Sequence, residues 1–443
     1  MKTPIFDFVA EYKDSGALRL HMPGHKGIGV PESCDITEIE GADSLFEAGG
    51  IIRESEMNAG EIFGSNTFYS AEGSSLSIRA MLYIISVYSG IDGKRVKILA
   101  GRNAHKSFVS GAALLGIDIE WLYPERFDSY LSCPVSAEDI SAYFATCDGL
   151  PAAVYLTSPD YLGNTVDIRN IAKVCHEHGV LLLVDNAHGA YLRFLPKSSH
   201  PIDLGADMCC DSAHKTLPVI TGGAYLHISR GAPSLFAEIA KTALSLFGST
   251  SPSYLILASL DKANAYLTDG YREKLSGFVA LVDATKDRLS KAGYVLVGNE
   301  PLKITIFGKP YGYTGKQIAK LLLDSGIVAE FSDPDFLVLM LTPEIGKQNL
   351  ERLETALLAI PRRDKICQPA PRFARPVAVT SPREAMLSPS EAIPAQDCLG
   401  RTLAAITVGC PPAVPVLVSG ERIDKESLEC FEYYGIEVLR VVK

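Results

Sequence analysis

An aspartate and a lysine form the chemically most informative pair in the chain. The apolar run 180–184 ends in Asp185, and Lys215 follows one short connection later, within Ser212-Ala213-His214-Lys215. Pyridoxal phosphate needs two such groups, because a lysine amine holds it as a Schiff base and a carboxylate keeps its pyridine nitrogen protonated, so that the ring serves as an electron sink. Spacing alone leaves open the alternative that Lys215 is a surface lysine and Asp185 a helix N-cap.

The residues around the lysine favour a fixed position for it. Ser212 and His214 flank it with small polar donors, and Pro218 with the pair Gly222-Gly223 indicates a tight connection that returns to a strand over 224–228. A connection of this kind would fix the lysine at a strand edge, from which it can reach into a cleft.

A phosphate group would need its own binding site, and residues 71–77 could provide it. This segment precedes the helical pattern 78–87; Gly73 permits close backbone approach, and Ser74 and Ser75 present hydroxyl and N–H groups at a helix N-terminus. A dianion is well stabilised at that place. An ordinary serine-rich helix cap has the same pattern, so the segment gains weight only together with Asp185 and Lys215.

Strands and helices alternate through the central part of the chain. Strands are expected at 95–100, 117–123, 152–157, 180–185 and 206–211, with helices at 105–116 and 166–178. Such alternation predicts an α/β fold with a mainly parallel sheet that is covered on both faces. Ligands of these sheets bind beyond the carboxyl ends of the strands, where Asp185, His105 and Thr157 are all expected.

Composition indicates a globular, cytoplasmic protein. With 443 residues, 47% hydrophobic residues and 37 glycines, two or three domains are expected. The net charge of -10 and the lack of a basic block argue against a nucleic-acid partner and slightly favour cationic substrates. We find neither a signal peptide nor an apolar stretch of membrane-spanning length. The ten cysteines contain no CxxC pair and are interpreted as reduced core thiols, with no metal site.

Seven dispersed segments resemble the Orn/Lys/Arg decarboxylase family, in its short bacterial branch without the N-terminal wing domain. They begin with His21-Met22-Pro23-Gly24-His25-Lys26-Gly27, Asp35-Ile36-Thr37-Glu38 with Asp43-Ser44-Leu45, Gly101-Arg102-Asn103-Ala104-His105-Lys106-Ser107 and Ser212-Ala213-His214-Lys215-Thr216-Leu217. Further matches are Phe331-Ser332-Asp333-Pro334-Asp335, Pro382-Arg383-Glu384-Ala385 and Pro411-Pro412-Ala413-Val414-Pro415. The resemblance implies a fold-type-I pyridoxal-phosphate enzyme with a transferase-like large domain, a small α/β domain and a C-terminal domain.

The resemblance also assigns roles to individual residues. Lys215 would carry the cofactor, Asp185 would pair with its pyridinium nitrogen, and His105 would stack on the ring. His188 would lie beside Asp185. The phosphate would be held by four residues: Ser74, Ser75, Ser212 and His214. A helix-start histidine facing solvent is the alternative for His105.

Three departures from the family pattern bear on the substrate. Asn186 stands where the family usually has an acid, Asp160-Tyr161 replaces the usual Thr-Tyr, and Ala413 replaces a usual Gly. None of them removes a group that the cofactor chemistry requires.

The expected organisation has six parts. They are an N-terminal arm (1–50), a large cofactor domain (51–255), connecting helices (256–293), a small α/β domain (294–365), a linker (366–381) and a C-terminal domain (382–443) packed over the mouth of the active site. The resemblance further implies a homodimer or higher homo-oligomer whose sites are built from both subunits, with the N-terminal arm reaching the partner.

The resulting hypothesis is decarboxylation of lysine, ornithine or arginine to the corresponding amine, in polyamine biosynthesis. The same cofactor would support transamination or aldol cleavage if another bond stood perpendicular to its ring, so an aminotransferase or aldolase-like lyase is the alternative. A non-catalytic regulatory homologue is a more distant one, since Lys215 and Asp185 are both retained.

Overall fold

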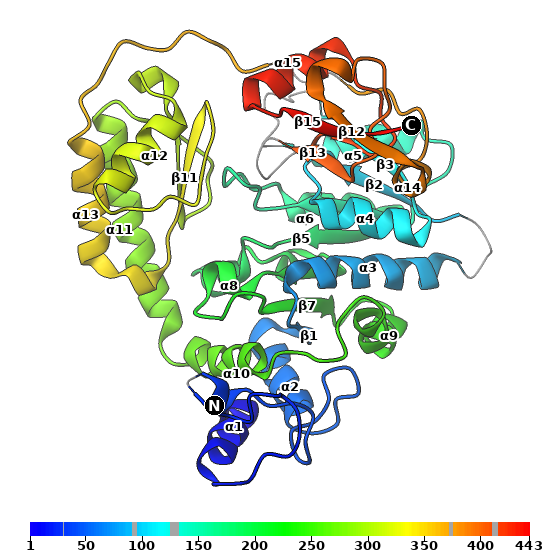
Figure 1. Cartoon of the computed structure of the whole chain (residues 1–443), viewed down its shortest axis with the longest axis vertical. Coiled ribbons are helices and arrows are strands. Elements are labelled where there is room, and N and C mark those ends of the chain that lie inside the picture. Colours follow the sequence, from blue (N-terminus) through cyan, green and yellow to red (C-terminus); the bar gives the residue numbers. More distant parts are fainter. Residues whose placement is uncertain (30, 91–94, 125–132, 372–374, 410–414) are drawn as a thin grey trace. The chain divides into compact units, whose positions relative to one another are not determined.

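The computed structural model describes residues 1–29, 31–90, 95–124, 133–371, 375–409 and 415–443 (Figure 1). The chain forms two compact units that are interleaved in sequence. The first consists of Met1–Val96, Ala152–Val154 and Ile168–Lys274, and the second of Lys97–Pro151, Tyr155–Asp167 and Leu275–Lys443. Residues 411–414 of one matched segment and 372–374 of the expected linker lie outside the described residues. The boundaries between the six expected parts stay a prediction.

Four neighbouring strands form the framework of the first unit. Strand β5 (Leu181–Asp185) runs parallel to β6 (Met208–Asp211), which pairs antiparallel with β7 (Ala224–Ser229), and β7 pairs antiparallel with β1 (Ser65–Ser70). Most of their side chains are buried on both faces, as continuous apolar runs such as Leu-Leu-Leu-Val in β5 predict. The buried polar side chains inside these strands, such as Thr67 and His227, therefore need hydrogen-bond partners within the protein.

Helices cover these strands. Helix α3 (Gly73–Ser89) packs against β1, β5, β6 and β7, while α6 (Ile168–Glu177) packs on β5 and α7 (Pro201–Leu204) on β6 and β7. The other helices of this unit are α1 (Pro4–Asp14), η1 (Glu32–Cys34), α2 (Ile51–Phe63), η3 (Ala190–Phe194), α8 (Ala213–Thr216), α9 (Ser234–Ser245), α10 (Tyr254–Thr268) and the start of α11 (Tyr271–Lys291). Helices α10 and α11 are separated at Gly270, whose φ of +68° is a left-handed conformation that suits glycine.

The second unit contains parallel strands β2 (Lys97–Gly101) and β3 (Asp118–Leu122) and an antiparallel sheet of order β10-β11-β9-β8. The latter strands are β8 (Val295–Val297), β9 (Lys303–Phe307), β10 (Phe331–Ser332) and β11 (Phe336–Met340). Two small antiparallel pairs follow: β12 (Ser390–Pro394) with β15 (Val438–Val442), and β13 (Thr407–Gly409) with β14 (Pro415–Val418). The helices are α4 (Lys106–Leu115), α5 (Ala137–Thr146), η4 (Lys309–Tyr311), α12 (Gly315–Asp324), η5 (Pro343–Ile345), α13 (Gly346–Leu358), α14 (Pro382–Leu387), η6 (Ala395–Asp397) and α15 (Lys425–Tyr434).

Strand β4 (Ala153–Thr157) completes a mostly parallel seven-stranded sheet of order β1-β7-β6-β5-β4-β2-β3. The α/β class expected from the sequence is thereby confirmed. The expected strands over 95–211 are all present, and most of their ends agree with the expected ones to within two residues. No helix in the described part of the chain is both long enough and apolar enough to cross a bilayer.

Candidate functional site

Asp185 lies at the carboxyl end of β5. It is the last residue of that strand, is 2% exposed, and stands opposite Cys210 of β6 in the parallel register. Its Oδ1 accepts the backbone N–H of Ala187 at 3.2 Å and lies 3.6 Å from the Cys210 thiol. A carboxylate at a buried strand end suits the binding of a cationic ring nitrogen, because the low local polarity strengthens such a pair.

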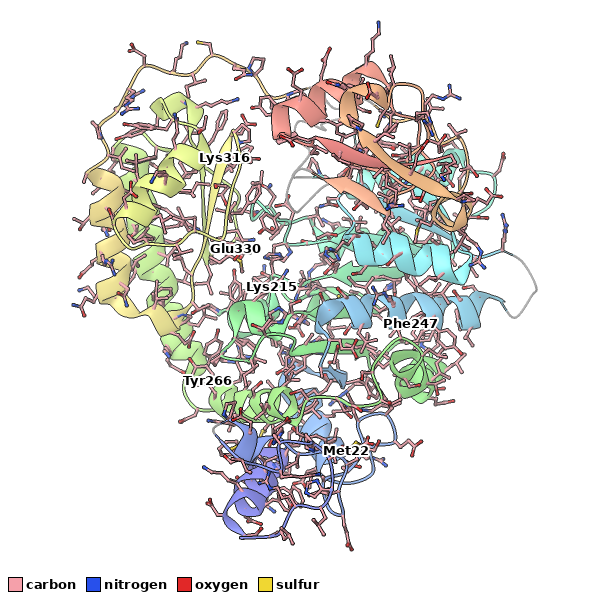
Figure 2. All side chains as sticks on the ribbon, in the orientation of Figure 1. Met22, Lys215, Phe247, Tyr266, Lys316 and Glu330 are labelled. Atoms are coloured by element: carbon pink, nitrogen blue, oxygen red, sulfur yellow. The ribbon has the colours of Figure 1, made fainter. Side chains whose placement is uncertain are left out.

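Lys215 is placed by the connection that leaves the neighbouring strand. After Asp211 the chain turns directly into the short helix α8, in which the Lys215 N–H donates to the Ser212 carbonyl at 3.0 Å. Its Nζ lies 3.1 Å from Nε2 of His188, a residue that is 6% exposed (Lys215 is labelled in Figure 2). His188 follows Asp185 by three positions, so that the turn after β5 places an imidazole against the lysine amine.

The turn after β5 tolerates little change at Gly189. A Cβ added there would come within 2.0 Å of Asn186 Oδ1 and 2.7 Å of a Leu192 methyl group. Glycine is therefore required for the close approach of this turn to the start of η3, which in turn fixes the position of His188.

The amino end of α3 forms the third part of the site. Ser74 lies in its first turn and accepts a hydrogen bond from the Ser212 hydroxyl at 2.9 Å, and no side chain of Glu72 caps the helix. Gly73 has a φ of +69° and donates its N–H to the Gly222 carbonyl at 2.7 Å. Two serine hydroxyls beside an amino end without a side-chain cap are suited to an anion such as a phosphate.

His214 borders this amino end. Its Nδ1 and its backbone N–H both donate to the Gly223 carbonyl, at 2.9 and 3.1 Å, and its Cε1 lies 4.0 Å from the position that a Cβ on Gly73 would occupy. Burial lowers the pKa of His214, with a smaller contribution from the charge of Lys215. The imidazole is thus neutral near pH 7 and is fixed by its Nδ1–H.

The first unit therefore contains seven of the eight residues expected at the site. Direct side-chain contacts join Ser74 to Ser212 and His188 to Lys215. The remaining members are Asp185 at the end of β5, Ser75 in the first turn of α3 and His214 on α8.

His105 belongs to the second unit. It is the N-cap of α4, where its Nδ1 accepts the Ser107 N–H at 3.3 Å, and its side chain is half-buried. The preceding turn is held by the Thr157 hydroxyl, which donates to the Asn103 carbonyl at 3.3 Å. His105 is thus the N-cap of α4, which agrees with the helix-start part of the alternative, and its stacking on a cofactor ring stays a prediction.

Sequence reasoning missed the role of Arg102 within the same motif. Its guanidinium binds Glu421 through two hydrogen bonds of 2.8 and 2.7 Å, with the two side chains 0% and 3% exposed. It also lies 4.9 Å from the centre of the Trp121 ring. Removing one member of such a buried pair typically costs about 3–5 kcal/mol, so the C-terminal segment is firmly attached to the 101–107 motif. The sequence shows an arginine in this motif, but neither its burial nor its partner Glu421 could be read from the sequence.

Two of the departures from the family pattern have local explanations. Asn186 donates its Nδ2 to Asp211 Oδ1 at 2.7 Å, and the Tyr161 hydroxyl donates to Glu330 at 3.0 Å. Asp160 is buried and accepts the Asn164 N–H at 2.8 Å, which closes the turn after β4. Ala413 lies outside the described residues.

Comparison with known proteins identifies the family and the fold of the chain. The family model for the major domain of Orn/Lys/Arg decarboxylases matches residues 3–305. An arginine decarboxylase of Halalkalibacterium halodurans is 31% identical over 96% of this chain and 92% of its own length, and one of Bacillus subtilis is 30% identical over the same shares. Among solved structures, the lysine decarboxylase of Francisella novicida superimposes with a TM-score of 0.81 at 19% identity, covering 100% of this chain and 81% of its own.

The sequence match spans well over half of the chain, and the structural likeness shows the same fold. The resemblance seen in the motifs is thereby confirmed. The chain belongs to the Orn/Lys/Arg decarboxylase family, a family of amino-acid carboxy-lyases.

Proposed function

We propose that this protein is a pyridoxal-phosphate-dependent decarboxylase of a basic amino acid, with arginine as the first candidate substrate. The observation that carries the proposal is the contact of Lys215 Nζ with His188 at 3.1 Å, beside the buried Asp185, in a chain of this family. Arginine is placed before lysine and ornithine because the near-full-length relatives at 30–31% identity are named arginine decarboxylases.

The residues of the first unit fit the cofactor in charge and kind. Ser74, Ser75 and Ser212 would hold the phosphate at the amino end of α3, with His214 at its border. Asp185 would face the pyridine nitrogen, and Lys215 would hold the aldehyde carbon. When bound, pyridoxal phosphate supplies a protonated ring that takes up the electron pair released as CO2 leaves.

The protein groups have separate tasks in this chemistry. Asp185 keeps a negative charge where the ring nitrogen needs one, and its burial excludes water that would weaken the pair. The Lys215 amine must lose a proton to act as a nucleophile, and His188 Nε2 is within hydrogen-bonding distance to receive it. His105 is proposed to present a flat face to the ring.

The cellular setting follows the same resemblance. We propose a cytoplasmic homodimer or higher homo-oligomer, with a small amino acid as substrate and neither nucleic acid nor membrane as a partner. The negative net charge of -10 supports a cationic substrate and opposes a nucleic-acid partner.

Purified protein loaded with pyridoxal phosphate should release CO2 and the corresponding amine from arginine, and more slowly or not at all from lysine and ornithine. A side-by-side assay of CO2 and amine product on the three amino acids checks this. Consumption of a keto acid without CO2 would favour an aminotransferase, and release of an aldehyde from a hydroxy amino acid would favour an aldolase-like lyase. If no reaction occurs although the cofactor binds, the decarboxylase proposal fails.

Lys215→Ala should lower turnover by at least about a thousandfold, because the covalent catalyst is lost. Borohydride reduction of the loaded wild-type protein, followed by peptide mapping, should place the pyridoxyl label on Lys215. Lys347→Ala is the matched control, since Lys347 is exposed on α13 and pairs only weakly with Glu351 at 3.5 Å. A label on Lys26 or Lys106 would overturn the assignment.

Asp185→Asn should reduce decarboxylation by orders of magnitude while the cofactor still binds, because the amide keeps the shape but not the charge. The variant separates two roles, since Asn could still accept the Ala187 N–H that Asp185 accepts at 3.2 Å. Steady-state kinetics and a cofactor titration measure the two effects. Near-normal turnover would show that Asp185 is only a turn-capping residue.

Three substitutions separate the ring of His105 from its capping role. Phe keeps a flat ring but cannot cap α4, Asn keeps a capping acceptor without the ring, and Ala keeps neither. Phe should retain much of the cofactor affinity and a measurable activity, whereas Asn and Ala should lose both. The melting temperature should instead depend on whether residue 105 can cap α4, so the Asn variant should have the melting temperature nearest to that of the wild type. Equal damage to cofactor binding by Phe and Ala would exclude stacking, and full binding with no turnover would reassign His105 to proton transfer.

A further inference from the structure

A fully buried polar cluster lies next to the site and has no place in the chemistry described so far. Its centre is Asp211, the last residue of β6. Asp211 Oδ2 accepts from Nε2 of His200 at 3.0 Å and from Nε2 of His227 at 3.2 Å, and its Oδ1 accepts from Nδ2 of Asn186 at 2.7 Å. All four side chains are 0% exposed.

The hydrogen bonds indicate an ionised aspartate that accepts from three N–H donors. Burial lowers the pKa of His227, and its Nδ1 is free to accept from the hydroxyls of Thr67 and Ser65, at 2.9 and 3.2 Å. Burial alone would raise the pKa of Asp211, but His200 and His227 more than offset this and hold its pKa well below the usual range. A carboxylate that accepts three N–H bonds is stable in its charged form even without water.

The cluster is joined to the site through the backbone. Successive side chains of a strand point to opposite faces, so Asp185 and Cys210 share one face while Asn186 and Asp211 meet on the other. The Asn186 N–H also donates to the Cys210 carbonyl at 3.0 Å. Asn186 directly follows Asp185, and Asp211 directly precedes Ser212, so the cluster fixes the backbone beside both.

Asn186 is held in an unusual way for a buried amide. Its Nδ2 binds Asp211, but its Oδ1 has no hydrogen-bond partner within the described part of the chain. A buried acceptor without a partner lowers the stability of the fold. The hydrogen bond from Asn186 Nδ2 to Asp211 must therefore offset the cost of the unpaired Oδ1. A carboxylate at position 186 would instead put two acids in direct contact.

We propose that Asn186 and Asp211, supported by His200 and His227, form a positioning cluster that aims Asp185 and Ser212 at the bound cofactor. The amide at position 186 is required because it donates to Asp211 from the turn that follows β5. The identity of the ligand rests on the function proposed above, whereas the cluster itself does not.

Other titratable groups border the cluster and are unchanged by the tests below. From β6 and β5 these are Cys209, Cys210 and Asp185; from β7, Tyr225; and from η3 and α7, the ion pair of Arg193 with Asp203. His200, Cys209 and Asp211 also have potential metal-ligand atoms within 4.8 Å of one another, so a metal site is the competing reading of this cluster.

Asn186→Asp is the decisive substitution. Two buried carboxyl groups in contact must share a proton, which raises the pKa of one of them above the unfolded value of about 4. The stability of the variant relative to wild type should therefore be best below about pH 4 and should fall as the pH rises through the raised pKa. Relative to wild type, the variant's dissociation constant for pyridoxal phosphate should be about tenfold or more higher at pH 8, and much less raised at pH 5.5.

Melting temperatures and cofactor titrations of the full-length protein at both pH values measure these effects. Asn349→Asp is the matched control, because Asn349 is exposed on α13. The melting temperature and the cofactor dissociation constant of this control, each relative to wild type, should be the same at both pH values. The melting temperature without cofactor tests the cluster alone. If the wild type takes up no pyridoxal phosphate, the proposed function is refuted. The pH-dependent loss of stability of Asn186→Asp then still tests the cluster.

The double variant Asn186→Asp with Asp211→Asn exchanges the two groups. The amide at 211 can accept from both histidines and donate to the new acid, so the number of donors and acceptors is preserved. The exchange should restore most of the cofactor affinity that Asn186→Asp loses at pH 8. No recovery would overturn the pairing on which the proposal stands.

Further outcomes also decide the matter. If Asn186→Asp does not fold, Asn186→Ala takes its place and should weaken cofactor binding by a similar factor at both pH values, because only a donor is lost. A folded but destabilised variant with unchanged cofactor affinity would show that the cluster is structural and positions nothing. One tightly held metal ion per chain, found by elemental analysis, would replace the proposal with a metal site.

Discussion

The parallel register between β5 and β6 is the constraint on which the site depends. Leu183 pairs with Met208, Val184 with Cys209 and Asp185 with Cys210, so the two strands end within one residue of each other. A shift by one residue would turn Asp185 to the opposite face and bring Asn186 into its place, because strand side chains alternate. The acid, the turn to His188 and the turn to Lys215 are therefore all set by one pairing.

Much of this arrangement could be predicted from the sequence. Apolar runs that end in a polar residue located β5 and β6, and the Gly222-Gly223 pair located the return to β7. Glycine and serine at residues 73–75 marked the start of α3. These features are local, since a strand, a turn or a helix start leaves its pattern within a few neighbouring residues.

The buried polar contacts could not be predicted in the same way. Arg102 and Glu421 are 319 positions apart, and Asn186 and Asp211 are 25 apart. A local sequence pattern does not predict such pairs, because their members are distant in sequence and come together only in the folded chain. The cysteine pair in β6 illustrates the limit: Cys209 was correctly expected to be a buried thiol, but its position beside Asp211 and His200 was not foreseen.

The two aspartates at the ends of β5 and β6 show how the chain divides its buried charge. Asp185 and Asp211 point to opposite faces of the sheet, and Asp211 is fully supplied with protein donors. Asp185 accepts the Ala187 N–H and lies near the Cys210 thiol, and its place at the buried carboxyl end of β5 suits a cationic ligand. An acid at position 186 would break this division, since the donors around Asp211 would then face two charges. The amide at position 186 therefore has a protein-internal role, because its Nδ2 donates to Asp211 Oδ1 at 2.7 Å.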